Sequence, residues 1–216
     1  MRATVLGLLI LVLATLVQGC SDTTEQPPPW VAVARLIRNG GPWGPGVYLQ
    51  SGWVITAGHL TSVTDTVHLY IAGVILPAKI LKQGSLDDVD LTLLEFDEEK
   101  LPAGKSLPQV PLCEAPPWPG DPVIVVDAKH ATRSHIVSPQ VLSFTWRVKF
   151  NTLVADVAST GNSGSGVFDP NQKCLLGIMS RKFTIQTTEG ERDVAKYFVP
   201  AVQIRSFLPA EVRESH

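Results

Sequence analysis

The sequence predicts an all-β fold, and three observations support this. From Trp30 onward, the 216-residue chain consists of short apolar runs separated by Gly, Pro and Asp, a pattern typical of strands and turns. No segment before the C-terminus repeats apolar residues at the helical spacing over several turns. A proline-rich stretch, 101–120, divides the runs into two halves of about six strands each. Such halves are typical of β-barrels or sandwiches.

The first half, 30–100, contains six runs with strand character. A Gly- and Pro-rich loop is expected at 39–46, and Ser51-Gly52 indicates a tight hairpin. The expected strands are Val31–Arg38, Val47–Gln50, Trp53–Thr56, Val67–Ile71, Val74–Leu81 and Leu91–Phe96.

The second half, 121–216, is expected to add further strands and one helix. Val202–Leu208 follows Pro200 and is the one candidate for a short helix. The expected strands are Val123–Asp127, Val141–Phe150, Leu153–Ala155, Gly166–Phe168, Leu175–Ser180, Phe183–Thr187 and Lys196–Val199.

The N-terminus has the features of an export signal. Arg2 precedes an apolar run from Ala3 to Val17, which is shorter than the about 20 residues that a membrane span needs. Val17-Gln18-Gly19-Cys20 resembles the lipobox of bacterial lipoproteins, which are cleaved before a cysteine that then carries the lipid. We therefore expect a signal peptide at 1–19, lipid attachment at Cys20 and a proline-rich tether at 20–29. The alternative is cleavage after Gly19 and plain secretion.

Cysteine usage agrees with an exported protein. The chain has three cysteines, and acylation of Cys20 would leave Cys113 and Cys174. Disulfides persist outside the cytoplasm, so these two could pair. The sequence leaves open whether their backbones come close enough.

Composition narrows the function classes. A content of 44% hydrophobic residues excludes a disordered tail protein. With 18 basic and 20 acidic residues, the formal charge is −2, which gives no reason to expect nucleic acid as a partner.

Three polar motifs stand at positions suited to catalysis. Thr56-Ala57-Gly58-His59 follows an apolar strand, and the pKa of histidine suits proton transfer near neutrality. Asp90 immediately precedes the apolar run Leu91-Thr92-Leu93-Leu94, which distinguishes it from the nearby Asp87 and Asp88. Gly161-Asn162-Ser163-Gly164 encloses a serine between glycines, on a tight turn where backbone N–H groups can converge.

Together the three motifs resemble those of the chymotrypsin-like, or trypsin-fold, serine peptidases. Asn162 and the closing Tyr197-Phe198-Val199-Pro200 are similar to the compact bacterial branch of glutamyl-endopeptidase-like and HtrA-like enzymes. The resemblance implies two six-stranded antiparallel β-barrels with the active site between them, followed by a short C-terminal helix. It also implies a serine endopeptidase that acts on polypeptides without a cofactor or metal.

The resemblance assigns a role to each motif. Ser163 would attack the scissile carbonyl, His59 would transfer the proton, and Asp90 would orient and stabilise the imidazole. The N–H groups of Gly161 and Ser163 would form the oxyanion hole.

The resemblance also implies which residues would determine substrate specificity. Val157, Ala158 and Ser159 would line the primary pocket, and Ser180 to Lys182 would lie beside the substrate backbone. Because Val157 supplies no acid at the pocket base, we expect an apolar or small residue before the scissile bond. Arg181 and Lys182 could instead favour acidic substrates.

Three alternative functions fit these residues less well. A catalytically inactive trypsin-fold binding module would not require His59, Asp90, Ser163 and Gly161 together. An α/β-hydrolase esterase would need glycine at Ser165 and a different chain order of its catalytic residues. A zinc enzyme is disfavoured, because His130 and His135 lack a third ligand at a suitable spacing.

Overall fold

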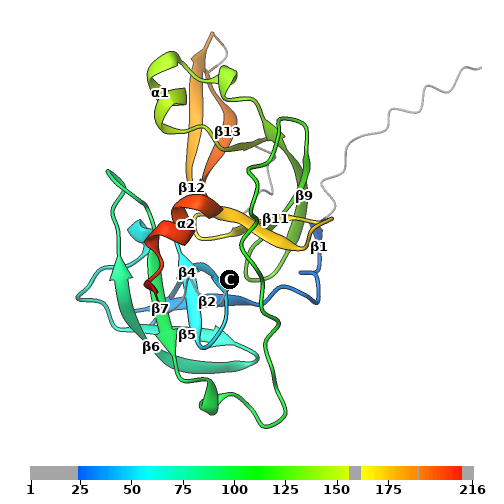
Figure 1. Cartoon of the computed structure of the whole chain (residues 1–216). Helices are drawn as coiled ribbons and strands as arrows, with labels where there is room; N and C mark the ends of the chain where they lie inside the picture. Colours follow the sequence, from blue (N-terminus) through cyan, green and yellow to red (C-terminus); the bar gives the residue numbers. More distant parts are fainter. Residues whose placement is uncertain (1–23, 156–161, 189, 211–216) are drawn as a thin grey trace, which may run out of the picture.

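Each half of the chain closes into a six-stranded antiparallel β-barrel, as the sequence predicted (Figure 1). The computed structural model describes residues 24–155, 162–188 and 190–210. The first barrel has the order β2-β3-β4-β7-β6-β5. Its strands are β2 (Val33–Arg38), β3 (Gly41–Tyr48), β4 (Trp53–Thr56), β5 (Val67–Ile71), β6 (Val74–Gln83) and β7 (Thr92–Phe96).

The second barrel has the order β9-β10-β13-β12-β11-β8 and closes through pairing of β8 with β9. Its strands are β8 (Pro122–Val126), β9 (Ala131–Val137), β10 (Leu153–Ala155), β11 (Gly166–Asp169), β12 (Cys174–Thr187) and β13 (Gly190–Pro200). The C-terminal helix α2 (Ala201–Phe207) follows β13 directly. No helix among the described residues has both the length and the apolarity needed to cross a membrane.

Strand alternation explains why the two barrels pack against each other. On β4, Val54 points into the first barrel, whereas Ile55 belongs to a cluster shared by both barrels. On β7, Leu94 likewise points into the first barrel, and Leu93 belongs to the shared cluster. Because successive side chains of a strand point to opposite faces, a strand that is apolar on both faces fills a barrel and also seals the interface. Thr56-Ala57-Gly58-His59 begins at the end of β4, and Asp90 lies shortly before β7, so both motifs adjoin these doubly buried strands.

Several local features differ from the expectation. The expected loop 39–46 mostly belongs to β3, the two strands expected within 175–187 are the single strand β12, and β9 was not predicted. The strand expected at Val141–Phe150 is wrong. That segment forms the 3₁₀ turn η3 (Pro139–Val141) and the helix α1 (Phe144–Lys149). Because β9 and β10 pair with each other, a segment between them has no strand edge to join.

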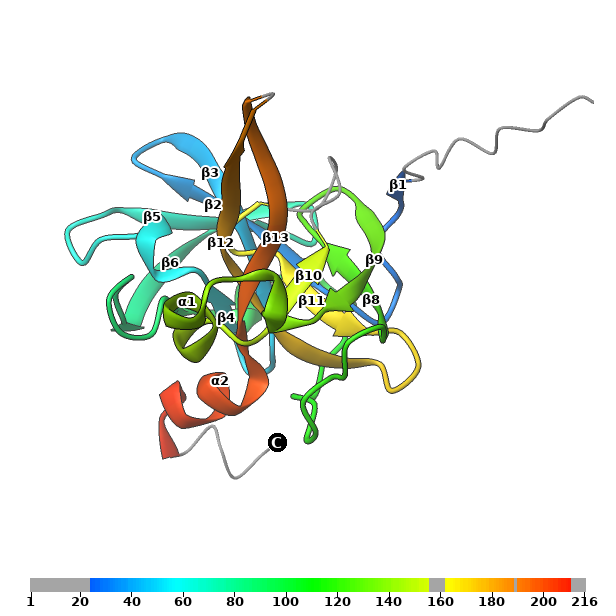
Figure 2. The same cartoon turned by 90° about the horizontal axis from the view of Figure 1, so that it is seen from above.

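Two stretches outside the barrels are tied to the second barrel. In the stretch 101–120, Cys113 forms a disulfide with Cys174 at the start of β12, with a Cα–Cα distance of 5.1 Å. Near the N-terminus, the short strand β1 (Thr24–Glu25) pairs with β9. Figure 2 shows β1 on one side of the molecule and α1 and α2 on the other.

Candidate active site

His59 lies in a 3₁₀ turn, η1 (Gly58–Leu60), that begins shortly after β4. Its backbone N–H donates to Oδ1 of Asp90 at 2.9 Å, and its Nδ1 lies 2.8 Å from Oδ2. The same carboxylate therefore holds both the backbone and the ring of His59. A β-carbon at Gly58 would lie 3.1 Å from Asp90 Oδ1 and 3.0 Å from the Leu91 nitrogen, so glycine permits this close approach.

Asp90 is the buried anion of the site. It is only 3% exposed and immediately precedes Leu91 of the core shared by the barrels. Burial would raise the pKa of Asp90, but hydrogen bonds from His59 and Ser180 outweigh it and hold the pKa below the usual value. The carboxylate is thus kept in the charged form that can orient an imidazole and stabilise its cation.

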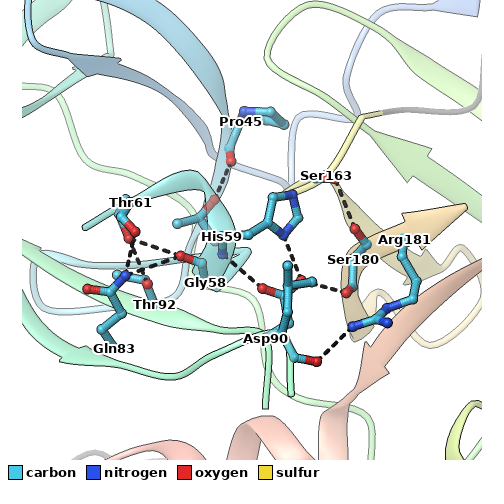
Figure 3. Close-up of polar contacts among 12 residues, drawn as sticks. Pro45, Gly58, His59, Thr61, Gln83, Asp90, Thr92, Ser163, Ser180 and Arg181 are labelled. Carbon is cyan, nitrogen blue, oxygen red and sulfur yellow. Dashed lines mark hydrogen bonds and ion pairs between the residues drawn. The ribbon is translucent and has the colours of Figure 1, made fainter. Parts of the chain in front are cut away.

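Ser163 comes from the second barrel and joins this cluster, as Figure 3 shows. Gly164 supports the turn with a φ of +88°, a conformation that favours glycine. A β-carbon there would also lie 2.3 Å from the carbonyl oxygen of Pro45. Ser163 Oγ donates to the carbonyl oxygen of Ser180 at 2.9 Å. Among the described residues, no hydrogen bond joins Ser163 Oγ to His59.

Ser180 makes two contacts that the sequence did not predict. The residue was expected only beside the substrate, but its hydroxyl donates to Asp90 Oδ2 at 2.6 Å while its carbonyl accepts from Ser163. Ser180 is 2% exposed, and its hydroxyl contact with Asp90 is buried. It connects the serine and the carboxylate across the two barrels.

Gln83, at the end of β6, holds the turn that carries His59. Its Nε2 donates to the carbonyl oxygen of Gly58 at 3.3 Å and to that of Thr61. Thr61 in turn shares a 2.8 Å hydrogen bond with Thr92 of β7. Sequence analysis missed Gln83, because nothing in a lone glutamine marks the carbonyl groups that it will contact.

Two cations of the second barrel hold the loop that precedes Asp90. Arg181 Nη2 donates to the carbonyl oxygen of Leu86 at 2.8 Å, and Lys149 Nζ donates to that of Asp87 at 3.1 Å. The guanidinium of Arg181 also lies 4.5 Å from the ring centre of Phe150. Arg181 is therefore engaged with this loop and this ring.

The structure brings His59, Asp90, Ser163 and Ser180 together. The other predicted site residues, Cys20, Val157, Ala158, Ser159 and Gly161, lie outside the described residues. In the described part of the chain, no group of three or more His, Cys, Asp or Glu is placed to hold a metal ion.

The sequence is similar to one family of known proteins. A sequence profile of the trypsin-like peptidase domain matches residues 44–178, which is more than half of the chain. A search of curated proteins found no match.

Solved structures share the fold at low sequence identity. Kallikrein-related peptidase 10 has a TM-score of 0.61 at 17% identity, covering 87% of this chain and 97% of that one. The active form of the Rv3671c protease from M. tuberculosis has a TM-score of 0.60 at 17% identity, covering 83% and 79%. The inactive form of the Rv3671c protease has a TM-score of 0.60 at 18% identity, covering 82% and 86%.

Proposed function

Because the chain belongs to the trypsin-like peptidase domain family, we propose that it is a serine endopeptidase that cleaves polypeptides through an acyl-enzyme on Ser163. The observation that carries this proposal is the 2.8 Å contact between His59 Nδ1 and Asp90 Oδ2. It leaves Nε2 of the same ring to receive a proton, next to a serine supplied by the other barrel.

The first half of the reaction requires a rotation of the Ser163 side chain. Its hydroxyl leaves the Ser180 carbonyl, to which it donates in this structure, and turns to His59 Nε2. His59 then takes the proton while Oγ attacks the scissile carbonyl carbon. Asp90 stabilises the imidazolium that forms. Backbone N–H groups of Gly161 and Ser163 are the proposed donors to the oxyanion, typically contributing about 3 kcal/mol each.

The second half releases both products. His59 returns its proton to the leaving amine as the C–N bond breaks and the acyl-enzyme remains. A water molecule then loses a proton to His59 and attacks the ester, and the proton returns to Ser163 Oγ as the acid product leaves. No cofactor takes part in this sequence.

A fluorophosphonate probe tests the proposal directly. We expect the full chain, purified in detergent, to be labelled at Ser163, as located by mass spectrometry. Ser163→Ala and His59→Ala should abolish labelling, whereas Ser206→Ala on the exposed face of α2 should leave it unchanged. Equal labelling of the Ser163→Ala protein would contradict the assignment.

A second candidate function is a catalytically inactive binding module. The observation in its favour is that Ser163 Oγ donates to Ser180 and not to His59. A folded protein, shown by cooperative thermal unfolding, that resists the probe over hours would establish this alternative. Labelling of Ser163 would exclude it.

We further propose that the protein is exported and anchored by a lipid on Cys20, with plain secretion as the alternative. The lipobox-like Val17-Gln18-Gly19-Cys20 supports this, and the Cys113–Cys174 disulfide agrees with an oxidising compartment. Radiolabelled palmitate should enter the wild-type chain but not Cys20→Ala. Incorporation that survives this substitution would refute the anchor.

For the residue before the scissile bond, we propose a preference for apolar or small side chains, based on Val157, Ala158 and Ser159 of the sequence. Cleavage of a peptide library by the full chain would measure it. A dominant preference for lysine or arginine would contradict the proposal.

A further inference from the structure

A pocket of about 440 Å³ lies between the two barrels, next to the proposed nucleophile. The first barrel contributes residues of β2 and β3, including Arg35 and Trp43. The second barrel contributes the turn between β8 and β9, with Asp127, Lys129 and His130, and also Asn162.

The pocket adjoins Ser163 directly. Asn162 precedes the serine in the chain, and a β-carbon on the lining residue Gly44 would lie 3.6 Å from the Ser163 carbonyl oxygen. In Figure 3, the lining residue Pro45 and Arg181 of β12 stand on opposite sides of His59. The pocket and the start of the Ser180–Lys182 strand therefore lie on different sides of the reacting group.

This position identifies the part of the substrate that the pocket would receive. The chain before the scissile bond is expected beside Ser180 to Lys182. The residues after the scissile bond must leave Ser163 on the other side, where the pocket opens. This step relies on the proposed endopeptidase function.

The lining has an excess of positive charge. No ion pair in the described ranges 24–155, 162–188 and 190–210 involves Arg35 or Lys129. The carboxylate of Asp127 accepts the backbone N–H groups of Lys129 at 2.7 Å and of His130 at 2.8 Å, and lies 3.9 Å from His130 Nδ1. With Arg35 and Lys129 against Asp127, the lining has one net positive charge.

The pocket also offers an apolar wall. Trp43 is 49% exposed, and one face of its indole ring is covered by the Arg38 guanidinium at 3.5 Å. Pro42 and Ala128 extend this wall. An apolar surface beside cations suits a side chain with a short methylene stem and a terminal carboxylate.

We propose that this pocket selects substrates with an acidic side chain, glutamate above all, at the first or second residue after the scissile bond. Arg35 and Lys129 would attract the carboxylate and Trp43 would contact its stem. Glutamine at the same position would retain the stem contact and lose the charge interaction.

Matched peptides test this proposal. Once a library has given a peptide that the full chain cleaves, the first and second residues after the cleaved bond are varied in turn among Glu, Gln and Lys. We expect kcat/KM for the best Glu peptide to exceed that of its Gln partner about tenfold, with the Lys peptide slower still. Raising the salt concentration should narrow the difference.

Charge reversal provides the second arm. Lys129→Glu should remove the preference for Glu over Gln and improve cleavage of the Lys peptide, while fluorophosphonate labelling of Ser163 stays unchanged. The matched control is Lys105→Glu, which reverses another exposed lysine outside the pocket.

The outcomes separate the two proposals. A protein that labels and cleaves, but treats Glu and Gln within twofold at both positions, would overturn the role of the pocket. If Lys129→Glu leaves the preference for Glu over Gln unchanged, Lys129 does not attract the substrate carboxylate, and its assigned role is overturned. A folded protein that neither labels nor cleaves would overturn the endopeptidase function and, with it, substrate selection by the pocket.

Discussion

The Ser180 hydroxyl reaches across from the second barrel and donates to the Asp90 oxygen that also contacts His59 Nδ1. The two contacts are 2.6 and 2.8 Å long. A carboxylate of the first barrel is therefore oriented by both halves of the molecule, and its contact with the imidazole depends on how the barrels are packed.

Ser180→Ala should weaken catalysis by removing one donor from Asp90. A hydrogen bond to a charged group contributes about 1.5–3 kcal/mol, so we expect kcat to fall about tenfold while KM stays within twofold. Steady-state kinetics on one cleaved peptide would measure this. Ser206→Ala is the matched control, and an unchanged kcat for Ser180→Ala would show that Asp90 is oriented without Ser180.

Asp90→Asn should preserve the fold and nearly abolish activity. The amide retains the shape of the carboxylate but favours the wrong imidazole tautomer and cannot stabilise the cation, so a loss of about 10⁴ in kcat is expected. The rate of fluorophosphonate labelling gives the comparison, with circular dichroism to confirm folding. A loss of less than tenfold would argue against Asp90 as the orienting acid.

Gln83→Leu should loosen the turn that carries His59. The side chain keeps its approximate size but loses its donations to the Gly58 and Thr61 carbonyls. We expect kcat to fall several-fold at nearly constant KM, because the imidazole is held less firmly while the substrate surface is intact. Gln172→Leu, on an exposed turn, serves as the control. Equal kcat values for the two variants would contradict this role.

Reduction of the Cys113–Cys174 disulfide should destabilise the second barrel. The bridge closes a sequence separation of 61 residues. Disulfides typically contribute 2–4 kcal/mol to the free energy of unfolding, and the chain-entropy estimate for a loop of this length is about 4 kcal/mol. Urea unfolding with and without dithiothreitol would show the difference. The Cys113→Ser, Cys174→Ser double variant should match the reduced wild type and respond no further to reductant.

Tyr197→Phe should make the free energy of unfolding depend less on pH in the alkaline range. Burial raises the pKa of Tyr197 to about 12, against roughly 10 in an unfolded chain. Between these values the unfolded state releases the proton first, so the wild type loses stability as pH rises from about 10 to 12. Phenylalanine keeps the ring contact with Phe150 and removes the titration. Denaturant unfolding at pH 9 to 12 should show that the free energy of unfolding falls less with pH in the variant than in the wild type.

Much of the fold was predictable from local sequence. Alternation and turn residues located most strands of the first barrel, because Gly, Pro or Asp stands at or near an end of most of them. The failure at 141–150 has a physical cause. Apolar residues alternate there as in a strand, yet Phe144, Trp146 and Val148 are exposed on α1 because the neighbouring strands already pair with each other. Pairing is a tertiary property that alternation alone does not reveal.

In the site too, some residues were predictable from local sequence and others were not. Three motifs identified His59, Asp90 and Ser163, since each stands in a recognisable local pattern. Ser180, Gln83 and the cations Arg181 and Lys149 act through contacts between elements distant in the chain, with separations such as 90 residues for Ser180 and Asp90. Nothing in their immediate neighbours specifies those partners.

The pairing of β1 with β9 limits the distance between the folded domain and a lipid on Cys20. Thr24 is already fixed to the second barrel, so a lipid on Cys20 would be connected to the folded part by only four Cα–Cα steps, at most about 14 Å. A peptidase anchored in this way would stay close to the membrane surface. Its substrates would be chains that come within a few nanometres of the bilayer, and release of the anchor would change which proteins it meets without altering its chemistry.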